Sequence, residues 1–260
     1  MDVKGKVALV TGSGSAGGIG RSTVLRLAKM GAKGVVVNHS NPRSAAKAEA
    51  VAAEAEALGA KAIICQADVS DDGQCRAMVD RAVAELGGLD ILVNNAATTV
   101  RVRFEDLEAL TDEIWDLNLG VNLKGSFYCI RAARDHLEAS REGAVVNIAS
   151  IAGIRAVGAS SIAYAASKAG VINMTMFLAR ALAPAVRVNC VTAGFVDGQW
   201  MQESLGDERF QKAQERTAAR IPMGRVADPD DVAQAICSLV ASDFITGQNL
   251  VCDGGFLIRD

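Results

Sequence analysis

Seven short runs of apolar and β-branched residues recur along the chain, most of them separated by alanine-rich stretches long enough for helices. Two of the runs contain continuously apolar triplets, at 35–37 and 91–93, which is typical of strands covered on both faces of a parallel sheet. The pattern predicts an α/β fold, a doubly wound three-layer sandwich of the Rossmann type with about seven parallel strands. We expect one domain over residues 1–260, because no repeat or long linker interrupts the pattern. The runs are residues 6–10, 33–38, 61–66, 89–94, 143–150, 185–191 and 249–252.

The first strand is followed by the glycine-rich segment GSGSAGGIG. It contains a literal G-x-G-x-x-G that ends at Gly17, and two further glycines at Gly18 and Gly20. Small and apolar residues recur with helical spacing from Gly20 to Gly31, which places the start of the helix near Gly18. Gly20 would let the helix pack closely on the strand, and Gly18 would let a pyrophosphate approach the helix N-terminus. We therefore expect a dinucleotide here, with a plain turn as the alternative.

Composition and charge exclude several classes of partner. The net charge of -3 comes from 27 basic and 30 acidic residues that are interspersed, so we expect no nucleic-acid partner. The sequence has neither an 18-residue apolar run nor the layout of a signal peptide, so we expect a cytoplasmic protein without a membrane partner. The 6 cysteines stand singly and there are only 2 histidines, which favours reduced thiols and no metal site.

A series of short motifs resembles, in order, those of the short-chain dehydrogenase/reductase family over nearly the whole chain. They are TG…GIG, ADV, NNAA, VNLKG, VNIAS, YAASK, RVNCVTAG and ITGQNLVCDGG. The resemblance implies an NAD(P)-dependent oxidoreductase that interconverts a ketone and a secondary alcohol, with the catalytic tetrad Asn122, Ser150, Tyr164 and Lys168. It implies that Ser150 polarises the substrate carbonyl and that Asn122 holds a water linking Lys168 to solvent. Lys168 would also bond the nicotinamide ribose.

Two residues of the YAASK motif suit acid–base chemistry. Tyr164 and Lys168 are four positions apart, so on a helix their side chains share a face. Ketone reduction needs a proton for the developing alkoxide, and a phenol with a pKa of about 10 is a poor partner near neutral pH. We expect the Lys168 ammonium and a bound nicotinamide to lower the pKa of Tyr164 by about 3. Without the other motifs, such a pair would be an ordinary feature of a helix surface.

The other tetrad members have simpler alternatives and nearby decoys. Ser150 could merely end a strand, and Asn122 could cap or terminate a helix. Asn118 has a similar setting, but Asn122 has the family spacing, seven residues after Trp115. Ser160 and Ser161 are closer to the tyrosine, and we interpret them as loop residues.

The choice of cofactor depends on the end of the second strand, which reads VVVNHSNPRS. NAD-specific relatives carry an acidic residue there, whereas Asn38 has no charge to repel a 2′-phosphate. His39, Ser40 and Arg43 are candidate donors to that phosphate, so we expect NADP, with NAD as the alternative. A solvated surface position is the alternative for Arg43. The expected cofactor contacts are Gly12, Ser13, Gly18, Ile19, Gly20, Asn38, His39, Ser40, Arg43, Asp68, Val69, Asn95, Ala96, Tyr164, Lys168, Gly194 and Val196.

The segment 197–222 should form a variable substrate lid, in which Trp200 and Met201 could line an apolar pocket or pack in the core. The chain departs from the family pattern in three places. The glycine loop is two residues longer than usual, Ser150 and Tyr164 are 14 positions apart rather than 13, and Gly198 replaces an expected threonine. The longer glycine loop leaves the pyrophosphate contacts of residues 13–17 open. From the other two departures we expect a bulge in the substrate loop and the loss of one contact with the carboxamide of the nicotinamide.

The substrate is a small carbonyl compound or alcohol whose identity the sequence leaves open. The motifs IPMGR, YAASKAG and ITGQ resemble those of 3-oxoacyl-carrier-protein reductases. Those enzymes carry a basic residue after the active-site helix, for which Arg141 is only a partial substitute. We expect a homotetramer, with a dimer as the alternative. Three other functions fit the sequence less well. A catalytically silent nucleotide sensor would predict a broken tetrad, whereas all four tetrad residues are present. A sugar-nucleotide epimerase would need a larger second domain than 260 residues allow, and a serine hydrolase would need a G-x-S-x-G motif, which the sequence lacks.

Overall fold

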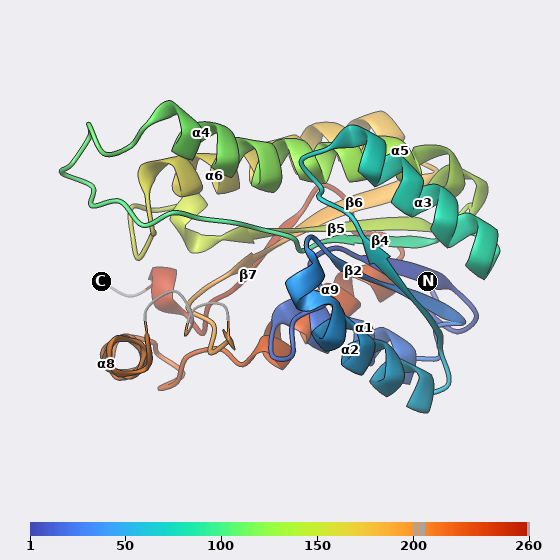
Figure 1. Ribbon diagram of the computed structural model, residues 1–260, viewed down its shortest axis with the longest axis horizontal. Helices are drawn as coiled ribbons and strands as arrows, with labels where there is room; N and C mark the ends of the chain where they lie inside the picture. Colours follow the sequence, from blue (N-terminus) through green and yellow to red (C-terminus); the bar gives the residue numbers. More distant parts are fainter. Residues whose placement is uncertain (200–201, 203–205, 259–260) are drawn as a thin grey trace.

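The computed structural model describes residues 1–199, 202 and 206–258, and a seven-stranded sheet forms its centre (Figure 1). Every pair of neighbouring strands is parallel, and their order is β3-β2-β1-β4-β5-β6-β7. The predicted fold class, a doubly wound sandwich with a parallel sheet, is confirmed. The strands are β1 (Val7–Val10), β2 (Gly34–His39), β3 (Lys61–Gln66), β4 (Ile91–Asn94), β5 (Gly143–Ser150), β6 (Val186–Ala193) and β7 (Asn249–Cys252).

Helices cover both faces of the sheet (Figure 1). One layer holds α3, α4, α5 and α6, and the other holds α1, α2 and α9, whereas α8 lies at one end of the molecule. A π-helical segment, Leu119–Lys124, joins α4 to α5. The helices are α1 (Ile19–Lys29), α2 (Ala45–Ala57), α3 (Asp72–Leu86), α4 (Asp112–Asn118), α5 (Gly125–Ala139), α6 (Ile162–Leu182), α8 (Asp207–Ala218) and α9 (Pro229–Ala241).

Two apolar cores lie on opposite faces of the sheet and explain the uninterrupted apolar runs. Successive residues of a strand point to opposite faces, so Val36 enters one core while Val35 and Val37 enter the other. All residues of β1, β2 and β4 are buried as a result. Both faces are therefore removed from water, which stabilises the fold by about 25 cal/mol for each Å² of apolar surface buried.

Polar residues fix where the helices begin. Asp71 caps α3 by accepting from Gln74 N, and Ser161 caps α6 by accepting from Tyr164 N. At α9, Asp228 and Asp231 form a reciprocal capping box ahead of the buried apolar face. These caps hold α6 and α9 in register with the strands on which they pack.

The strand order reverses direction between β1 and β4, which are neighbours in the sheet. The chain leaves β1 toward one side and later leaves β4 toward the other, so a crevice opens outside their carboxyl ends. The glycine-rich loop after β1 and the NNAA segment after β4 both lie at this switch point. The topology therefore brings together motifs that are about 80 residues apart in the sequence.

Among the described residues, α6 is the one helix with the length and hydropathy of a membrane span. A core helix of a globular protein meets the same criterion. The buried residues of α6 include Ser167, Lys168 and Val171, and the helix packs against β5 and β6. Packing on the sheet accounts for the buried part of its apolar surface, whereas Met176 and Phe177 of the same helix are exposed.

Candidate active site

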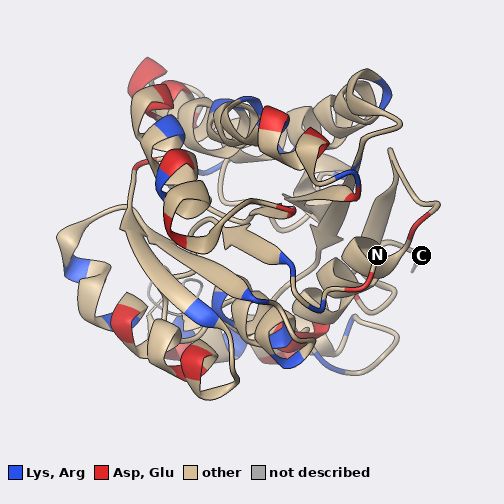
Figure 2. Ribbon diagram, turned by 90° about the vertical axis from the view of Figure 1, so that its right-hand side faces the viewer, with Lys and Arg blue, Asp and Glu red and all other residues tan. Residues whose placement is uncertain are grey.

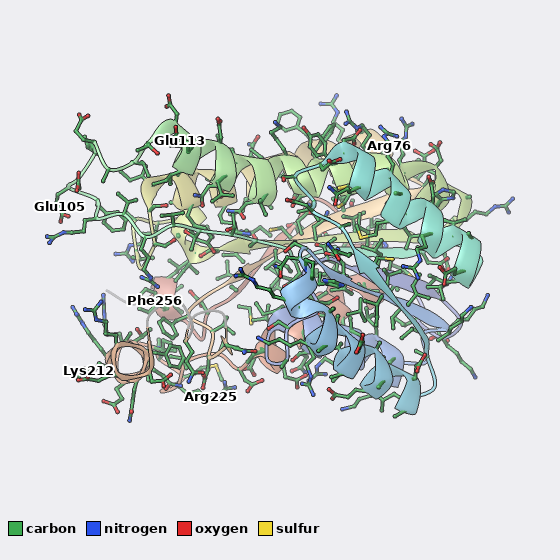
Figure 3. The ribbon with its side chains drawn as sticks, in the orientation of Figure 1. Arg76, Glu105, Glu113, Lys212, Arg225 and Phe256 are labelled. Carbon is green, nitrogen blue, oxygen red and sulfur yellow. The ribbon has the colours of Figure 1, made fainter. Side chains whose placement is uncertain are left out.

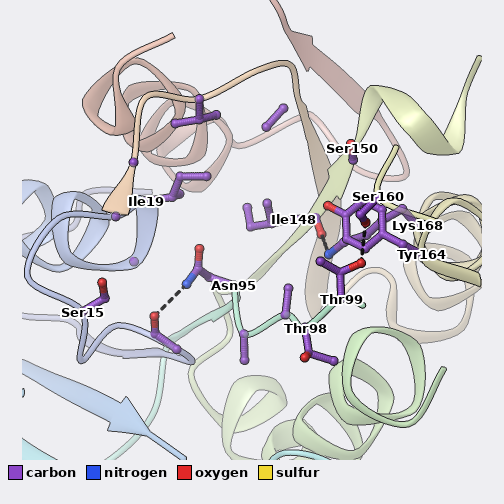
Figure 4. Close-up of a pocket in the computed structure, with 18 of the residues that line it drawn as sticks. Ser15, Ile19, Asn95, Thr98, Thr99, Ile148, Ser150, Ser160, Tyr164 and Lys168 are labelled. Atoms are coloured by element: carbon purple, nitrogen blue, oxygen red, sulfur yellow. Dashed lines mark hydrogen bonds between the residues drawn. The ribbon is translucent and has the colours of Figure 1, made fainter. Parts of the chain in front are cut away.

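A cavity of about 860 Å³ lies at the carboxyl ends of the strands, between the two helical layers (Figure 4). One end is formed by the glycine-rich loop and the ends of β2 and β3, and the other contains Ser150 and Tyr164. Most of the predicted site residues line it, but Ser13, Arg43 and Asn122 do not. The predicted residues in its wall are Gly12, Gly18, Ile19, Gly20, Asn38, His39, Ser40, Asp68, Val69, Asn95, Ala96, Ser150, Tyr164, Lys168, Gly194 and Val196.

The glycine loop leaves the N-terminus of α1 open to the cavity. The helix begins at Ile19 with Gly18 as its N-cap, as predicted, and no side chain caps it. A Cβ added to Gly18 would meet nothing closer than Ser15 Oγ at 3.8 Å. The backbone amides of this turn are therefore accessible, and the positive end of the helix dipole faces the cavity. This arrangement fits the pyrophosphate of a dinucleotide.

Gly20 permits a close approach of α1 to the chain that leaves β1. An added Cβ would lie 2.8 Å from both Gly12 O and Ser13 Cα, and 2.7 Å from Asn95 Nδ2. The helix also contacts β1 itself, as expected, and its closest approach at Gly20 is to the turn after that strand and to the NNAA segment.

Polar side chains hold the loop and the NNAA segment together. Thr11 Oγ1 accepts from the backbone amides of Asn95 and Ala96, at 3.0 Å each. Asn95 Nδ2 donates in return to Thr11 O at 2.9 Å and to Gly12 O at 3.1 Å. Thr11 was not among the predicted site residues, although its place in the TG motif could have identified it. Its role is to fix the floor of the cavity.

Ser13 and Asn38 lock the loop to β2. Ser13 Oγ donates to Val10 O at 2.7 Å and accepts from Asn38 N at 3.1 Å. Asn38 Oδ1 accepts from Gly12 N at 2.8 Å, and its Nδ2 donates to Ala67 O at 3.0 Å. Because the Ser13 side chain is fully buried, it positions the cavity wall without forming part of it.

Beyond the end of β2, Lys47 lines the cavity and the predicted contact residue Arg43 does not. Arg43 lies in the 3-10 turn Pro42–Ser44, where Asn41 Oδ1 accepts from its backbone amide at 3.0 Å. Lys47, on the first turn of α2, lines the cavity together with Ser40 and Ser44. Sequence reasoning missed Lys47, although it follows Arg43 by four positions and the two can share a helical face.

Tyr164 and Lys168 project from α6 into the end of the cavity that also contains Ser150 (Figure 4). Lys168 is buried, and its Nζ lies 5.9 Å from the centroid of the Tyr164 ring. Nζ also donates to the backbone carbonyl of Ile148 at 2.8 Å, which ties α6 to β5. Ser150 ends β5 two residues later and lines the same cavity. The helix and strand therefore place a phenol, an ammonium and a hydroxyl around one space.

Burial disfavours the charged forms of both side chains. It raises the pKa of Tyr164, an effect that a hydrogen bond with Ser150 opposes. Burial lowers the pKa of Lys168 to about 8, with a smaller opposing effect from Cys190. The site without a cofactor therefore does not show the expected lowering of the tyrosine pKa. The reason is that desolvation of the phenol outweighs the favourable contacts that this chain supplies.

Asn122 lies in the π-helical segment, where both polar atoms of its side chain form hydrogen bonds with other residues of the protein. Its Oδ1 accepts from Thr98 N at 2.8 Å, and its Nδ2 donates to Thr98 O at 3.0 Å and to Ser167 Oγ at 2.9 Å. It thereby joins the NNAA segment to α6. By contrast, Asn118 Nδ2 donates to Ile114 O within its own helix, so only Asn122 links separate parts of the site.

Two hydroxyl side chains that were not among the predicted site residues also line the cavity near Tyr164. Thr99 Oγ1 and Ser160 Oγ form a hydrogen bond, and both residues line the cavity near Tyr164 (Figure 4). Ser160 does precede α6, as interpreted, but Ser161 is the N-cap of that helix and accepts from Tyr164 N at 3.2 Å. The preference of N-caps for serine could have identified Ser161 from the sequence.

The remaining predicted features are only partly brought to the site. Gly198 lines the cavity, whereas Trp200 and Met201 lie outside the described residues. Arg141 has a left-handed conformation, φ 61°, in the turn between α5 and β5. This turn is at the amino end of β5, the same edge of the sheet as the segment that follows α6, because Gly143 of β5 pairs with Val186 of β6. The interpretation of Arg141 as a partial substitute for the basic residue after the active-site helix therefore stays a prediction.

Comparisons with known proteins identify the family to which the chain is similar. Residues 12–257 match a family described as enoyl-(acyl carrier protein) reductase. The chain is 43% identical over 249 residues to a Streptomyces violaceoruber protein named as ketoacyl reductase 2 of the granaticin polyketide synthase, covering 96% of this chain and 95% of that protein. It is 38% identical over 261 residues to the 3-oxoacyl-[acyl-carrier-protein] reductase FabG of Thermotoga maritima, covering 99% and 100%.

A solved structure extends the similarity to the fold. The blue fluorescent protein from a metagenomic library, in complex with NADPH, superposes with a TM-score of 0.87. It is 32% identical, and the alignment covers 98% of this chain and 99% of that one. Together with the parallel sheet and the arrangement of Ser150, Tyr164 and Lys168, these similarities show that the chain belongs to the short-chain dehydrogenase/reductase family of oxidoreductases.

Proposed function

We propose that the protein is an NADP(H)-dependent oxidoreductase that interconverts a ketone and a secondary alcohol, with Tyr164 as the general acid and base. The observation that carries this proposal is the meeting of Ser150, Tyr164 and Lys168 at one end of a cavity whose other end is the glycine loop. A catalytic triad and a dinucleotide cradle in one cavity suit hydride transfer between a cofactor and a small molecule.

Each side chain has a distinct task in this proposal. The bound nicotinamide supplies or accepts the hydride. During reduction, the Ser150 hydroxyl donates a hydrogen bond to the carbonyl oxygen, and the Tyr164 hydroxyl gives it a proton as negative charge develops. The Lys168 ammonium, held by Ile148 O, favours the phenolate that remains. It would also hold the ribose of a bound nicotinamide. Asn122 keeps the NNAA segment and α6 at a fixed separation, and the water expected beside it would connect Lys168 to solvent.

The glycine loop and the ends of β2 and β3 are assigned to the cofactor. Gly18 and the first turn of α1 would hold the pyrophosphate, and Asp68 and Val69 would contact the adenine. His39, Ser40, Arg43 and Lys47 are assigned to the 2′-phosphate. NADP is preferred over NAD because no carboxylate occupies the end of β2, and because the similar solved structure contains NADPH.

The substrate is proposed to be a small carbonyl compound or the corresponding alcohol. The relatives named as ketoacyl reductases make a 3-oxoacyl thioester one candidate, and small ketones and sugars are others. Gly198 and α8 would belong to the lid over this end of the cavity, within a single domain spanning residues 1–260.

The oligomeric state and the cellular location of the protein are proposed from its exposed apolar side chains and from the distribution of its charges. Large apolar side chains are exposed on α4, α5 and α6, among them Leu117, Phe127 and Phe177, and burial of these faces between copies would give a homotetramer. Basic and acidic residues are mixed over the helices in Figure 2, and this mixture in the described part of the chain supports neither a nucleic acid nor a membrane as the partner. We propose a cytoplasmic enzyme.

The function is tested by a panel of ketones and secondary alcohols with NADPH and NADH, followed by the near-ultraviolet absorbance of the reduced nicotinamide. We expect turnover of at least one ketone class with NADPH. Tight NADPH binding without turnover of any compound would instead favour the alternative, a catalytically silent sensor of the same fold.

A further inference from the structure

Basic groups outnumber carboxylates in the wall of the cavity. Among the described lining residues, four carry a positive charge, namely Lys47, Arg101, Lys168 and Arg220, and Asp68 alone carries a negative one. Asp68 follows β3, at the end assigned to the adenine, where its Oδ1 accepts from Ser70 N at 2.9 Å. The two arginines remain to be explained, because neither belongs to the glycine loop or the catalytic group.

Arg101 is held beside the catalytic end by the segment that follows β4. Val102 N donates to Ser160 O at 2.9 Å, and the neighbouring hydrogen bond between Thr99 and Ser160 faces the cavity near Tyr164 (Figure 4). The guanidinium thus projects from a backbone anchored on both sides. Burial lowers the pKa of Arg101, which means that surrounding protein atoms have removed part of its hydration.

Arg220 lines the same cavity and belongs to a different part of the chain, the turn after α8. Its guanidinium carbon lies 5.2 Å from the centroid of the Phe256 ring, and Thr217 and Phe256 line the cavity with it. Asp253 fixes the turn that carries Phe256 by accepting from Gly255 N at 2.8 Å and Leu257 N at 2.9 Å. Figure 3 shows Phe256 between α8 and the loop that bears Glu105.

We propose that the substrate carries an anionic group, a carboxylate or a phosphate, which binds between Arg101 and Arg220 while its carbonyl reaches Tyr164. This inference rests on the proposed function and adds a substrate class to it. A guanidinium offers a planar pair of donors that matches either anion, and two of them in the lining of one cavity would also attract the substrate into it. The anion belongs either to an oxo acid itself or to the phosphates of a thioester carrier.

Two pairs of substrates distinguish these sources. The first pair is 4-oxopentanoate and its methyl ester, which differ in the charge and in one methyl group. The second is acetoacetyl-CoA and the acetoacetyl thioester of N-acetylcysteamine, which share the reacting group, whereas the second compound lacks the phosphates together with the adenosine and pantoyl parts of the carrier. Initial rates with NADPH give kcat/KM, and calorimetric titration of the charged member into the enzyme–NADP complex gives affinity without turnover.

The variants Arg101→Gln and Arg220→Gln remove one cation each, with Arg103→Gln and Arg216→Gln as matched controls. Arg103 is an exposed neighbour that pairs with Glu105 at 3.7 Å, and neither control residue lines the cavity. We expect kcat/KM for the charged member of at least one pair to exceed that of its neutral partner by tenfold or more. Each site variant should lose about tenfold in affinity for that charged member.

The outcomes separate the inference from the function on which it rests. Reduction of neutral and charged partners at equal rates in both pairs, with no effect of either site variant, would overturn the anion site and leave ketone reduction standing. Binding of a charged member that depends on both arginines, without turnover, would support the anion site and contradict the proposed reductase activity. A preference in the first pair alone identifies an oxo acid, and one in the second alone identifies a carrier thioester.

Discussion

The Lys168 Nζ lies 5.9 Å from the centroid of the Tyr164 ring and is held in place by the carbonyl of Ile148, 2.8 Å away. The two side chains are four positions apart on one helix, and a strand residue fixes the ammonium. Sequence spacing gives the shared face, but the Ile148 contact exists only because α6 packs across the end of β5. The charge is therefore positioned by the sheet and not by the helix alone.

The pH dependence of reduction should report the titration of Lys168. Burial lowers its pKa to about 8, so the ammonium is present below that pH and is lost as the pH rises through it. We expect kcat/KM for ketone reduction to fall above pH 8 in proportion to the lost charge. In Lys168→Arg the cation persists to higher pH, so this limb of the profile should disappear even if the rate is lower. A limb at pH 8 that survives in this variant would assign the titration to another group.

The preference for NADPH should depend more on Lys47 than on Arg43. Only Lys47 lines the cavity, so we expect Lys47→Ala to weaken NADPH binding by about 1.5–3 kcal/mol and leave NADH binding nearly unchanged. Arg43→Ala should have a smaller effect in the same direction. Fluorescence titration of the two cofactors measures both. Equal losses for NADH and NADPH, or a wild-type preference for NADH, would contradict the assignment of the 2′-phosphate site.

The close packing of Gly20 predicts a specific loss of stability. In Gly20→Ala the new Cβ would lie 2.8 Å from Gly12 O, so we expect a destabilisation of about 1–3 kcal/mol. Gly17→Ala is the control in the same loop, because its Cβ would meet nothing closer than 3.9 Å, and it should change stability little. Urea unfolding without cofactor compares them. Equal stabilities would show that the loop adjusts without cost.

Ser150 and Tyr164 should behave as a unit. Ser150→Ala removes the proposed hydrogen bond to the carbonyl and should lower kcat while cofactor affinity stays near normal. Combining it with Tyr164→Phe should cost less than the sum of the two separate effects, because each variant already disables the same step. Single-turnover rates with saturating NADPH measure the three variants. Strict additivity would indicate that the two hydroxyls act in separate steps.

The fold was predictable because its strands are short, apolar and buried on both faces. The side chains of Val35, Val36 and Val37 point alternately into the two cores, so all three must be hydrophobic. A short uninterrupted hydrophobic run of this kind is typical of a strand in a parallel sheet covered on both faces. The start of α1 at Ile19 could likewise be predicted. Glycine destabilises a helix, so Gly18 and Gly20 are best explained by a close approach of other groups at the start of the helix.

The details that sequence reasoning missed depend on loop conformation. The turn Pro42–Ser44 decides that Lys47 and not Arg43 lines the cavity, and no periodic pattern describes such a turn. Thr99 and Ser160 meet across 61 residues because the segment after β4 folds back on the start of α6. Burial of Tyr164 raises its pKa, which spacing alone could not indicate because it depends on the surrounding packing.

The most direct test of the account is Tyr164→Phe, measured for turnover and for NADPH affinity on a ketone that the wild type reduces. The substitution removes one hydroxyl, so the fold and the cofactor affinity should persist while kcat falls by at least about 10²–10⁴, the usual contribution of a general acid. Near-normal turnover in Tyr164→Phe would contradict the central claim and assign the proton to another group.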